Sequence, residues 1–361
     1  MGLVIRSSGK LVFPFAFLFA FLLCPVLGLA QESAESSLQS GEPQVGEPAS
    51  QQSSVVDNAK VKAIEAAKEI LFASERIVFL GDSNTHAAEY IVQLEAAILE
   101  TFGTSPEMIN LGLGSETCCG LSEPSHPFPR PNVLERLDRA IAKTKPDIVV
   151  ACYGMNDGIY HPFDKMRFEA YQNGINTIIK KVEASGAKLI LLTPPPFDPT
   201  SARLAGKLVP VDAKEFSWKT IYENYDSEVL KRYADWILEQ RSRVLVVVDT
   251  HQPISDYLKQ KRKTEPEFAF SHDGVHFDKT GHKVFAQAIL DELAKSCGVE
   301  AKLSSNQKLV RLVRKRQSIS HLAWLSEVKH LRPGVKDGLP MEKAKQEMKP
   351  ISDEIGSLLP K

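Results

Sequence analysis

Short apolar runs alternate with amphipathic stretches through most of the chain. Five runs have the composition of buried strands, at 76–80, 107–111, 147–153, 188–192 and 244–249. Apolar residues recur at helical spacing in the stretches 59–71, 87–99, 133–141, 168–182, 227–241 and 280–297. Strands that alternate with helices and are buried on both faces predict an α/β protein with a parallel sheet and right-handed crossovers.

The first 30 residues have the pattern of an export signal. Arg6 and Lys10 precede an apolar run at 11–26, and small residues stand near Ala30, where a signal peptidase would cut. We therefore expect export to the periplasm, the cell envelope or the medium. The alternative is an uncleaved N-terminal membrane anchor, although the prolines in this segment count against a clean spanning helix.

The rest of the chain divides by composition into three parts. Residues 31–58 are rich in Ser, Gln, Glu, Gly and Pro and predict a disordered linker. Residues 59–300 carry the strand and helix pattern of one catalytic domain. Residues 301–361 predict a helical extension in which basic side chains surround an apolar stripe. This extension either packs on the domain or contacts anionic envelope material.

Charge and cysteine content narrow the possible partners and chemistry. The 361 residues carry a net charge of -1, which removes the usual electrostatic argument for a nucleic-acid partner. Four cysteines remain after the leader, and an even count permits disulfides of undetermined connectivity in an exported protein. Cys152 lies in an apolar strand, so we expect it to be a buried small hydrophobic residue.

Polar motifs follow the predicted strands. Four segments carry them, at 81–85, 110–117, 154–157 and 273–276. Ser83, Ser115 and Asn156 come after the first three strands, and polar residues at the carboxyl ends of parallel strands converge on one edge of the sheet. Asp273 and His276 lie between the last strand and the last helix of the domain, which can place them at the same edge. Together the segments supply the nucleophile, oxyanion donors and oriented base that acyl transfer requires.

The order and local sequences of these segments resemble the SGNH (GDSL-type) serine esterase family, from about residue 72 to residue 297. The resemblance implies a flavodoxin-like three-layer sandwich with a five-stranded parallel sheet. It also implies that Ser83 is the nucleophile and that the Asn156 amide binds the oxyanion. The family's glycine N–H donor aligns with Ser115, where serine suffices if the backbone permits, and Gly114 is the alternative. The Ser83 N–H is a further expected donor.

His276 is the expected general base, and Asp273 orients it from three residues away. The other nearby histidines are expected to be surface or capping residues: His251, His272 and His282. A metal pair of His272 and His276 lacks an evident third ligand at a suitable spacing, so we expect neither a metal nor a cofactor. We expect Asp157 to brace its loop.

The long loops 120–132 and 194–225 are expected to form substrate walls or lids, and Tyr160, His161 and Phe163 are candidate substrate contacts. The function hypothesis is an exported carboxylic ester hydrolase, with an acetyl ester of a carbohydrate as the preferred substrate. The alternatives are a lipase, lysophospholipase or thioesterase of the same fold, or a catalytically silent binding module. The expected partner is a small-molecule or polysaccharide ester, and the oligomeric state stays open.

Overall fold

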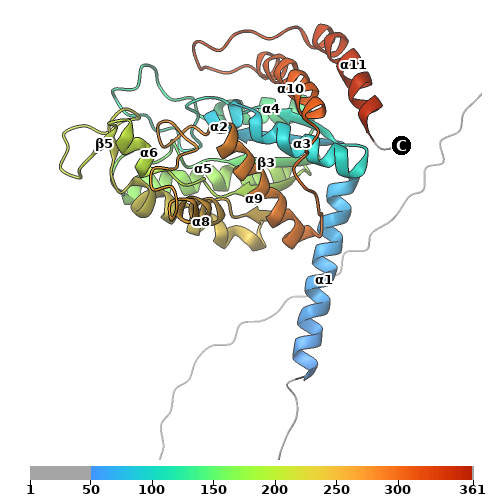
Figure 1. Ribbon diagram of the computed structural model, residues 1–361, viewed down its shortest axis with the longest axis horizontal. Coiled ribbons are helices and arrows are strands. Elements are labelled where there is room, and N and C mark those ends of the chain that lie inside the picture. Colours follow the sequence, from blue (N-terminus) through green and yellow to red (C-terminus); the bar gives the residue numbers. More distant parts are fainter. Residues whose placement is uncertain (1–49, 360–361) are drawn as a thin grey trace, which may run out of the picture. The chain divides into compact units, whose positions relative to one another are not determined.

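A computed structural model describes residues 50–359, with side chains from residue 61 onward (Figure 1). The predicted signal peptide and residues 31–49 of the predicted linker lie outside the described residues, so those predictions stay open. Helix α1 (Ser50–Ala73) begins inside the segment predicted as linker, earlier than expected. From Gln51 onward the chain forms one compact unit, which includes the extension after residue 300.

The central sheet has the predicted five parallel strands, in the order β2-β1-β3-β4-β7. Their bounds are Arg76–Gly81 for β1, Glu107–Asn110 for β2, Ile148–Cys152 for β3, Lys188–Leu192 for β4 and Val246–Val248 for β7. This order confirms the flavodoxin-like arrangement. The short strands β5 (Leu208–Val209) and β6 (Ile221–Tyr222) form a separate pair in the loop predicted at 194–225.

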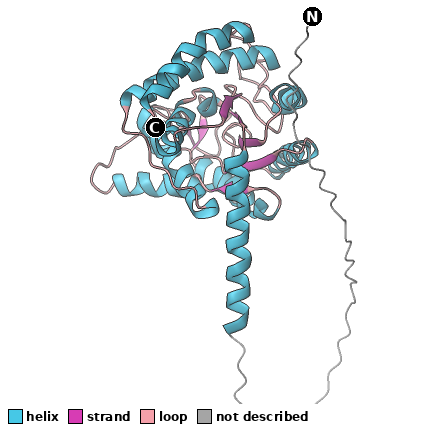
Figure 2. Cartoon of the chain, turned by 90° about the vertical axis from the view of Figure 1, so that its right-hand side faces the viewer, coloured by secondary structure: helices cyan, strands magenta, loops and turns pink. Residues whose placement is uncertain are grey.

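Helices cover both faces of the sheet (Figure 2). The helices of the domain are α2 (Ser83–His86), α3 (Glu89–Phe102), α4 (Val133–Thr144), α5 (Lys165–Ala184), α6 (Pro199–Leu204), α7 (Lys231–Leu238), α8 (His251–Lys261) and α9 (Lys279–Cys297). A π-helical turn (Tyr225–Leu230) and a 3-10 turn (Glu239–Ser242) flank α7. Alternate strand residues enter the two cores, with Val78 facing α4, α5 and α7, and Phe79 facing α1, α3, α8 and α9.

The extension forms two helices, α10 (Gln307–Val328) and α11 (Met341–Leu358). Val313 of α10 and Ile355 of α11 pack against α3, while Trp324 of α10 joins the core on the other side of the sheet. In the second helix, Ala344, Ile351 and Ile355 form a buried stripe. The extension is therefore part of the folded body.

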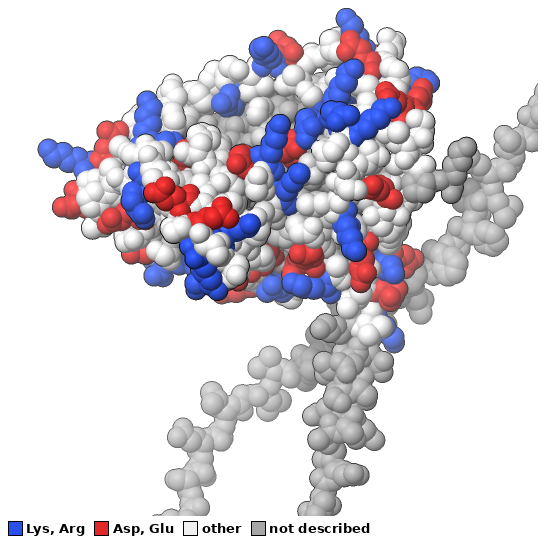
Figure 3. Space-filling model, in the orientation of Figure 1, with Lys and Arg blue, Asp and Glu red and all other residues white. Residues whose placement is uncertain are grey.

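The basic side chains of α10 are largely paired. Figure 3 shows Lys and Arg over this part of the molecule with acidic side chains beside them. Arg314 pairs with Glu89 of α3, Arg316 pairs with Glu95 of α3, and Lys308 pairs with Glu354 of α11. These pairs favour packing on the domain over contact with an anionic surface. No described helix combines the length and hydropathy needed to cross a bilayer.

Candidate active site

The nucleophile candidate stands where β1 gives way to α2. Asp82 caps α2 by accepting a hydrogen bond from the Asn84 N–H at 3.0 Å, and Ser83 is the first residue of the helix. Ser83 is half-buried, and neither its hydroxyl nor its N–H has a hydrogen-bond partner among the described residues. An exposed hydroxyl beside a free N–H at a helix start suits attack on an ester and binding of the resulting oxyanion.

Asn84 joins this turn to the loop of the general-base candidate. Its Nδ2 donates to the Val275 carbonyl at 3.0 Å, and its Oδ1 accepts from the Phe277 N–H at 3.1 Å. Val275 and Phe277 flank His276, so the buried Asn84 side chain holds the two reactive segments together. No local sequence pattern indicates this role of Asn84, because its partners are 191 and 193 positions away.

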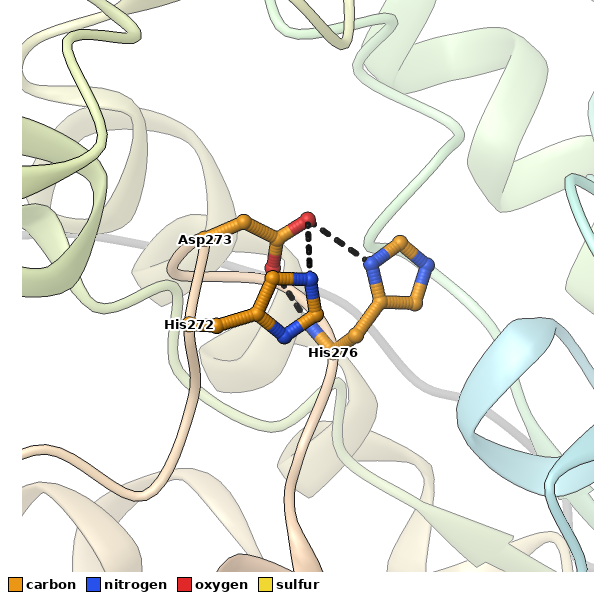
Figure 4. Close-up of side chains that lie close together, drawn as sticks. All are labelled: His272, Asp273 and His276. Atoms are coloured by element: carbon orange, nitrogen blue, oxygen red, sulfur yellow. Dashed lines mark hydrogen bonds and ion pairs between the residues drawn. The ribbon is translucent and has the colours of Figure 1, made fainter.

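His276 and Asp273 form the predicted pair (Figure 4). The His276 Nδ1 lies 2.9 Å from Asp273 Oδ2, while Asp273 Oδ1 accepts from the N–H groups of Val275 and His276, each at 2.9 Å. Burial alone would raise the pKa of Asp273. The bonds from His276 and its charge outweigh burial and lower that pKa well below its ordinary value. Asp273 is therefore ionised at neutral pH and can stabilise an imidazolium.

Lys207, from the loop before β5, donates to the same Asp273 Oδ2 at 3.1 Å. The Lys207 side chain is 20% exposed and that of Asp273 is 7% exposed, so the contact is partly withdrawn from water. Trp218 lies under the Lys207 ammonium, 5.6 Å from ring centroid to Nζ. The loop predicted as a wall or lid thus reaches the His276–Asp273 pair.

His272 is not part of this hydrogen-bonded pair. Its side chain is 79% exposed and its Nε2 lies 3.9 Å from Asp273 Oδ2. The ligand atoms of His272, Asp273 and His276 nevertheless lie within 4.8 Å of one another, so Asp273 supplies the third donor that spacing alone did not reveal. Because Asp273 Oδ2 already receives His276 Nδ1 and the Lys207 ammonium, the donor set suits an orienting carboxylate better than a metal ligand.

Ser115 has a backbone conformation that glycine adopts most easily. Its φ is 67°, in the left-handed region, whereas Gly114 has no positive φ. Neither N–H has an acceptor among the described residues. Gly112 lets this loop approach α2, because a Cβ there would lie 2.4 Å from the His86 nitrogen. Serine holds this left-handed conformation at a cost that glycine would not have, and the role of the Ser115 N–H as oxyanion donor stays a prediction.

Asn156 lies in the loop after β3 with its amide fixed on both sides. Its Nδ2 donates to the Glu116 carbonyl at 3.1 Å, and its Oδ1 accepts from the Tyr160 hydroxyl at 2.8 Å. One Nδ2 hydrogen stays available for a substrate oxygen. Tyr160 was expected to contact the substrate, but it is buried. Its burial indicates that it orients Asn156 instead.

Two buried ion pairs brace the same edge of the sheet. Arg136 of α4 binds Glu116 through two nitrogens at 2.6 and 2.7 Å, directly after Ser115. Arg130 binds Glu123 at 2.6 and 2.7 Å within the loop 120–132. Removing one partner from such a pair would leave an uncompensated buried charge, so we expect the loss of either partner to destabilise this edge strongly.

The remaining candidates take structural positions. Asp157 accepts the N–H groups of Cys118 and Cys119 at 2.8 and 2.9 Å, as expected of a loop brace. His251 is buried beside Asp226 and His282 is buried against Tyr90, so neither is the surface residue that was expected. Half-buried His161 and Phe163 pack against Phe216 and Phe168 respectively. The four described cysteines are unbridged, and Cys152 is buried as expected.

The fold is a parallel-sheet α/β sandwich whose carboxyl edge gathers Ser83, the loop of Ser115 and the His276–Asp273 pair. A family model described as the GDSL-like lipase/acylhydrolase family matches residues 79–284, more than half of the chain. This chain therefore belongs to that family, which confirms the resemblance found in the sequence. The match leaves α10 and α11 outside it.

Several solved structures are similar to this chain at low identity. One is a gut microbial diltiazem-metabolizing enzyme, with 20% identity and a TM-score of 0.48 over 62% of this chain and 47% of that chain. Another is the acetylxylan esterase Axe2 from Geobacillus stearothermophilus, with 18% identity and a TM-score of 0.44 over 61% and 94%. A third is the psychrotrophic esterase EstA from Pseudoalteromonas sp., with 16% identity and a TM-score of 0.41 over 62% and 100%. This chain thus spans about half the length of the first. A search of curated proteins found no significant match.

Proposed function

We propose that this protein is an exported serine hydrolase that cleaves short-acyl esters of carbohydrates, acetyl esters above all. The observation that carries the proposal is the pair of hydrogen bonds from the Asn84 side chain, which ties the Ser83 turn to the loop that carries His276 and Asp273. A free hydroxyl next to an oriented imidazole is the arrangement that nucleophilic ester cleavage requires.

The proposed reaction uses this chain's groups in order. His276 accepts the Ser83 proton as Oγ attacks the ester carbonyl, and the imidazolium is stabilised by Asp273. The N–H groups of Ser83 and Ser115 and the Asn156 amide receive the negative charge on the carbonyl oxygen. His276 then returns the proton to the leaving alcohol, and water releases the acid from the acyl-enzyme by the same steps.

The location of apolar surface supports a short acyl group. A cavity of about 420 Å³ is lined mainly by apolar side chains, including Leu71, Leu94 and Phe102, but no proposed catalytic residue lines it. A long acyl chain needs an apolar groove that continues from the reacting carbonyl. The carboxyl edge that holds Ser83 instead presents the charged Lys207 and the half-buried Trp218. A polar surface that includes an aromatic side chain suits a sugar ring better than a long acyl chain.

Export rests on the sequence of the first 30 residues. Expression of the full chain in a bacterium, followed by fractionation and N-terminal sequencing, tests it. A mature N-terminus near Gln31 outside the cytoplasm is expected. A full-length N-terminus in the membrane fraction would favour the anchored alternative.

Fluorophosphonate labelling separates an esterase from a silent binding module. The protein lacking residues 1–30 should be labelled, and Ser83→Ala should abolish both labelling and ester turnover. Ser125→Ala is the matched control, because Ser125 is an exposed serine on the neighbouring loop 120–132. Full activity of Ser83→Ala would overturn the assignment, and an unlabelled wild-type protein would favour the binding module.

Chain length separates the carbohydrate esterase from a lipase or thioesterase. Acetyl, butyryl and dodecanoyl esters of one alcohol should be hydrolysed with kcat/KM falling as the chain lengthens. A rate that rises with chain length would favour the lipase alternative, and a strong preference for the matching thioester would favour a thioesterase.

A further inference from the structure

The segment after α10 returns to the carboxyl edge of the sheet through Arg332. Arg332 Nε donates to the Gly114 carbonyl at 2.8 Å, and Gly114 directly precedes Ser115. A Cβ on Gly114 would lie 3.2 Å from Nε and 3.3 Å from Nη2, so glycine at 114 leaves room for the guanidinium. A residue from outside the family match thus contacts the proposed oxyanion loop.

Arg332 differs from the other arginines of this edge in its charge balance. Arg130 and Arg136 each bind a buried glutamate through two nitrogens. Arg332 has no carboxylate partner among the described residues: Nε binds Gly114, Nη1 binds the Pro333 carbonyl, and Nη2 has no acceptor there. Burial lowers the pKa of Arg332, as expected for a partly desolvated cation without a counter-charge.

An aromatic ring lies beside the guanidinium. The Phe128 ring centroid is 5.3 Å from the Arg332 guanidinium carbon, and Phe128 belongs to the loop 120–132, predicted as a substrate wall. Half-buried Phe128 can pack against a sugar ring while Arg332 meets a charged group on it. The loop and the extension therefore form one surface next to the oxyanion loop.

We propose that Arg332 binds a carboxylate on the substrate, so that the preferred ester is an acetylated acidic sugar. The inference rests on the proposed esterase function and adds the class of sugar. A guanidinium matches a planar carboxylate geometrically, and the free Nη2 supplies donors for it. The bound carboxylate also provides the counter-charge that the protein itself lacks at this position.

The test compares one acetylated hexuronic acid glycoside as the free acid and as its neutral methyl ester at the carboxyl group. Wild-type protein should release acetate from the free acid with a kcat/KM at least ~10-fold higher, mainly through a lower KM, as expected for charge-assisted hydrogen bonds. Arg332→Met should remove that preference, because only the free acid loses a charge-assisted contact, whereas any loss of the Gly114 contact lowers the rates on both substrates alike. Lys336→Met is the control, because Lys336 is exposed in the same segment and has no ion-pair partner among the described residues.

The outcomes separate the two proposals. Equal wild-type rates on the acid and the neutral ester would overturn the role of Arg332 and leave the esterase function standing. Equal losses on both substrates in Arg332→Met would mean that Arg332 only supports the Gly114 loop. Release of acetate from neither substrate would overturn both proposals.

A second measurement does not depend on how the variant folds. Free hexuronate should inhibit wild-type hydrolysis of a neutral acetyl ester at least ~10-fold more strongly than the matching hexuronamide, because only the hexuronate carries the charge. Equal inhibition by the two compounds would contradict the proposal.

Discussion

The two edges of the central sheet differ in chemistry. The carboxyl edge holds Ser83, Asn156 and the His276–Asp273 pair. Arg130 and Arg136 at this edge are each paired with a buried glutamate, whereas Arg332 has no carboxylate partner among the described residues. The other edge, near the starts of β1 and β2, holds the apolar cavity of about 420 Å³. This apolar cavity therefore lies away from the reactive groups, so an apolar cavity alone would misplace the site.

Two histidines at the carboxyl edge test which imidazole there is reactive. His276→Ala should lower kcat by about a thousandfold or more, because it removes the base that Asp273 orients. His272→Ala should change kcat less than about threefold, since His272 is 79% exposed and lies 3.9 Å from the same carboxylate. Steady-state kinetics on one acetyl ester compare the two variants. The assignment fails if His272→Ala is the more damaging change.

Asn84 tests whether the carboxyl edge works as one assembly. Asn84→Ala removes both hydrogen bonds to the residues flanking His276, so kcat and the rate of fluorophosphonate labelling should fall together by about 10- to 100-fold. KM should change little, because Asn84 is buried away from substrate. Near-normal labelling in a folded Asn84→Ala variant would show that Ser83 and His276 are aligned by other contacts.

The contrast between the edges also shows what sequence patterns can and cannot predict. The strands and Ser83, Asn156, Asp273 and His276 were predictable, because hydrophobic period and local motifs place them after particular strands. Asn84, Lys207 and Arg332 were not, because their partners are distant in sequence: Asn84 bonds across 191 positions and Arg332 across 218. No local pattern records such contacts. Nothing in the sequence around Gly114 indicates that the Arg332 side chain packs against it.

The pKa of Asp82, which lies next to Ser83 at this edge, makes the stability of the protein depend on pH. Burial raises the pKa of Asp82 from 3.8 to about 6, although the Asn84 N–H and the charge of His276 oppose the rise. The unfolded chain releases this proton near pH 3.8, so between pH 3.8 and 6 the folded state binds more protons. Stability therefore falls as pH rises through this window, by about 3 kcal/mol in total at the usual 1.4 kcal/mol per pKa unit.

The variant Asp82→Asn should remove this penalty, because an amide oxygen can still accept the Asn84 N–H. Thermal unfolding should show a higher Tm than wild type at pH 7.5 and a difference that shrinks toward pH 4. We expect kcat to change by only a few fold. A Tm difference that does not vary with pH would contradict the raised pKa of Asp82.

Substitutions at the opposite edge should lower the stability of the protein without changing its catalytic rate. Leu94 of α3 is 4% exposed and lines the apolar cavity, so Leu94→Ala enlarges that cavity and should lower the free energy of unfolding by about 2–5 kcal/mol. The kcat for an acetyl ester should stay within about twofold of wild type, because no proposed catalytic residue lines the cavity. Thr101→Ala, at an exposed position on the same helix, should change neither quantity measurably. Urea unfolding and initial rates measured on the same samples separate the two effects. A fall in kcat that matched the loss of stability would mean that the two edges are coupled through the sheet. The edges would then differ in composition but not in their effect on catalysis.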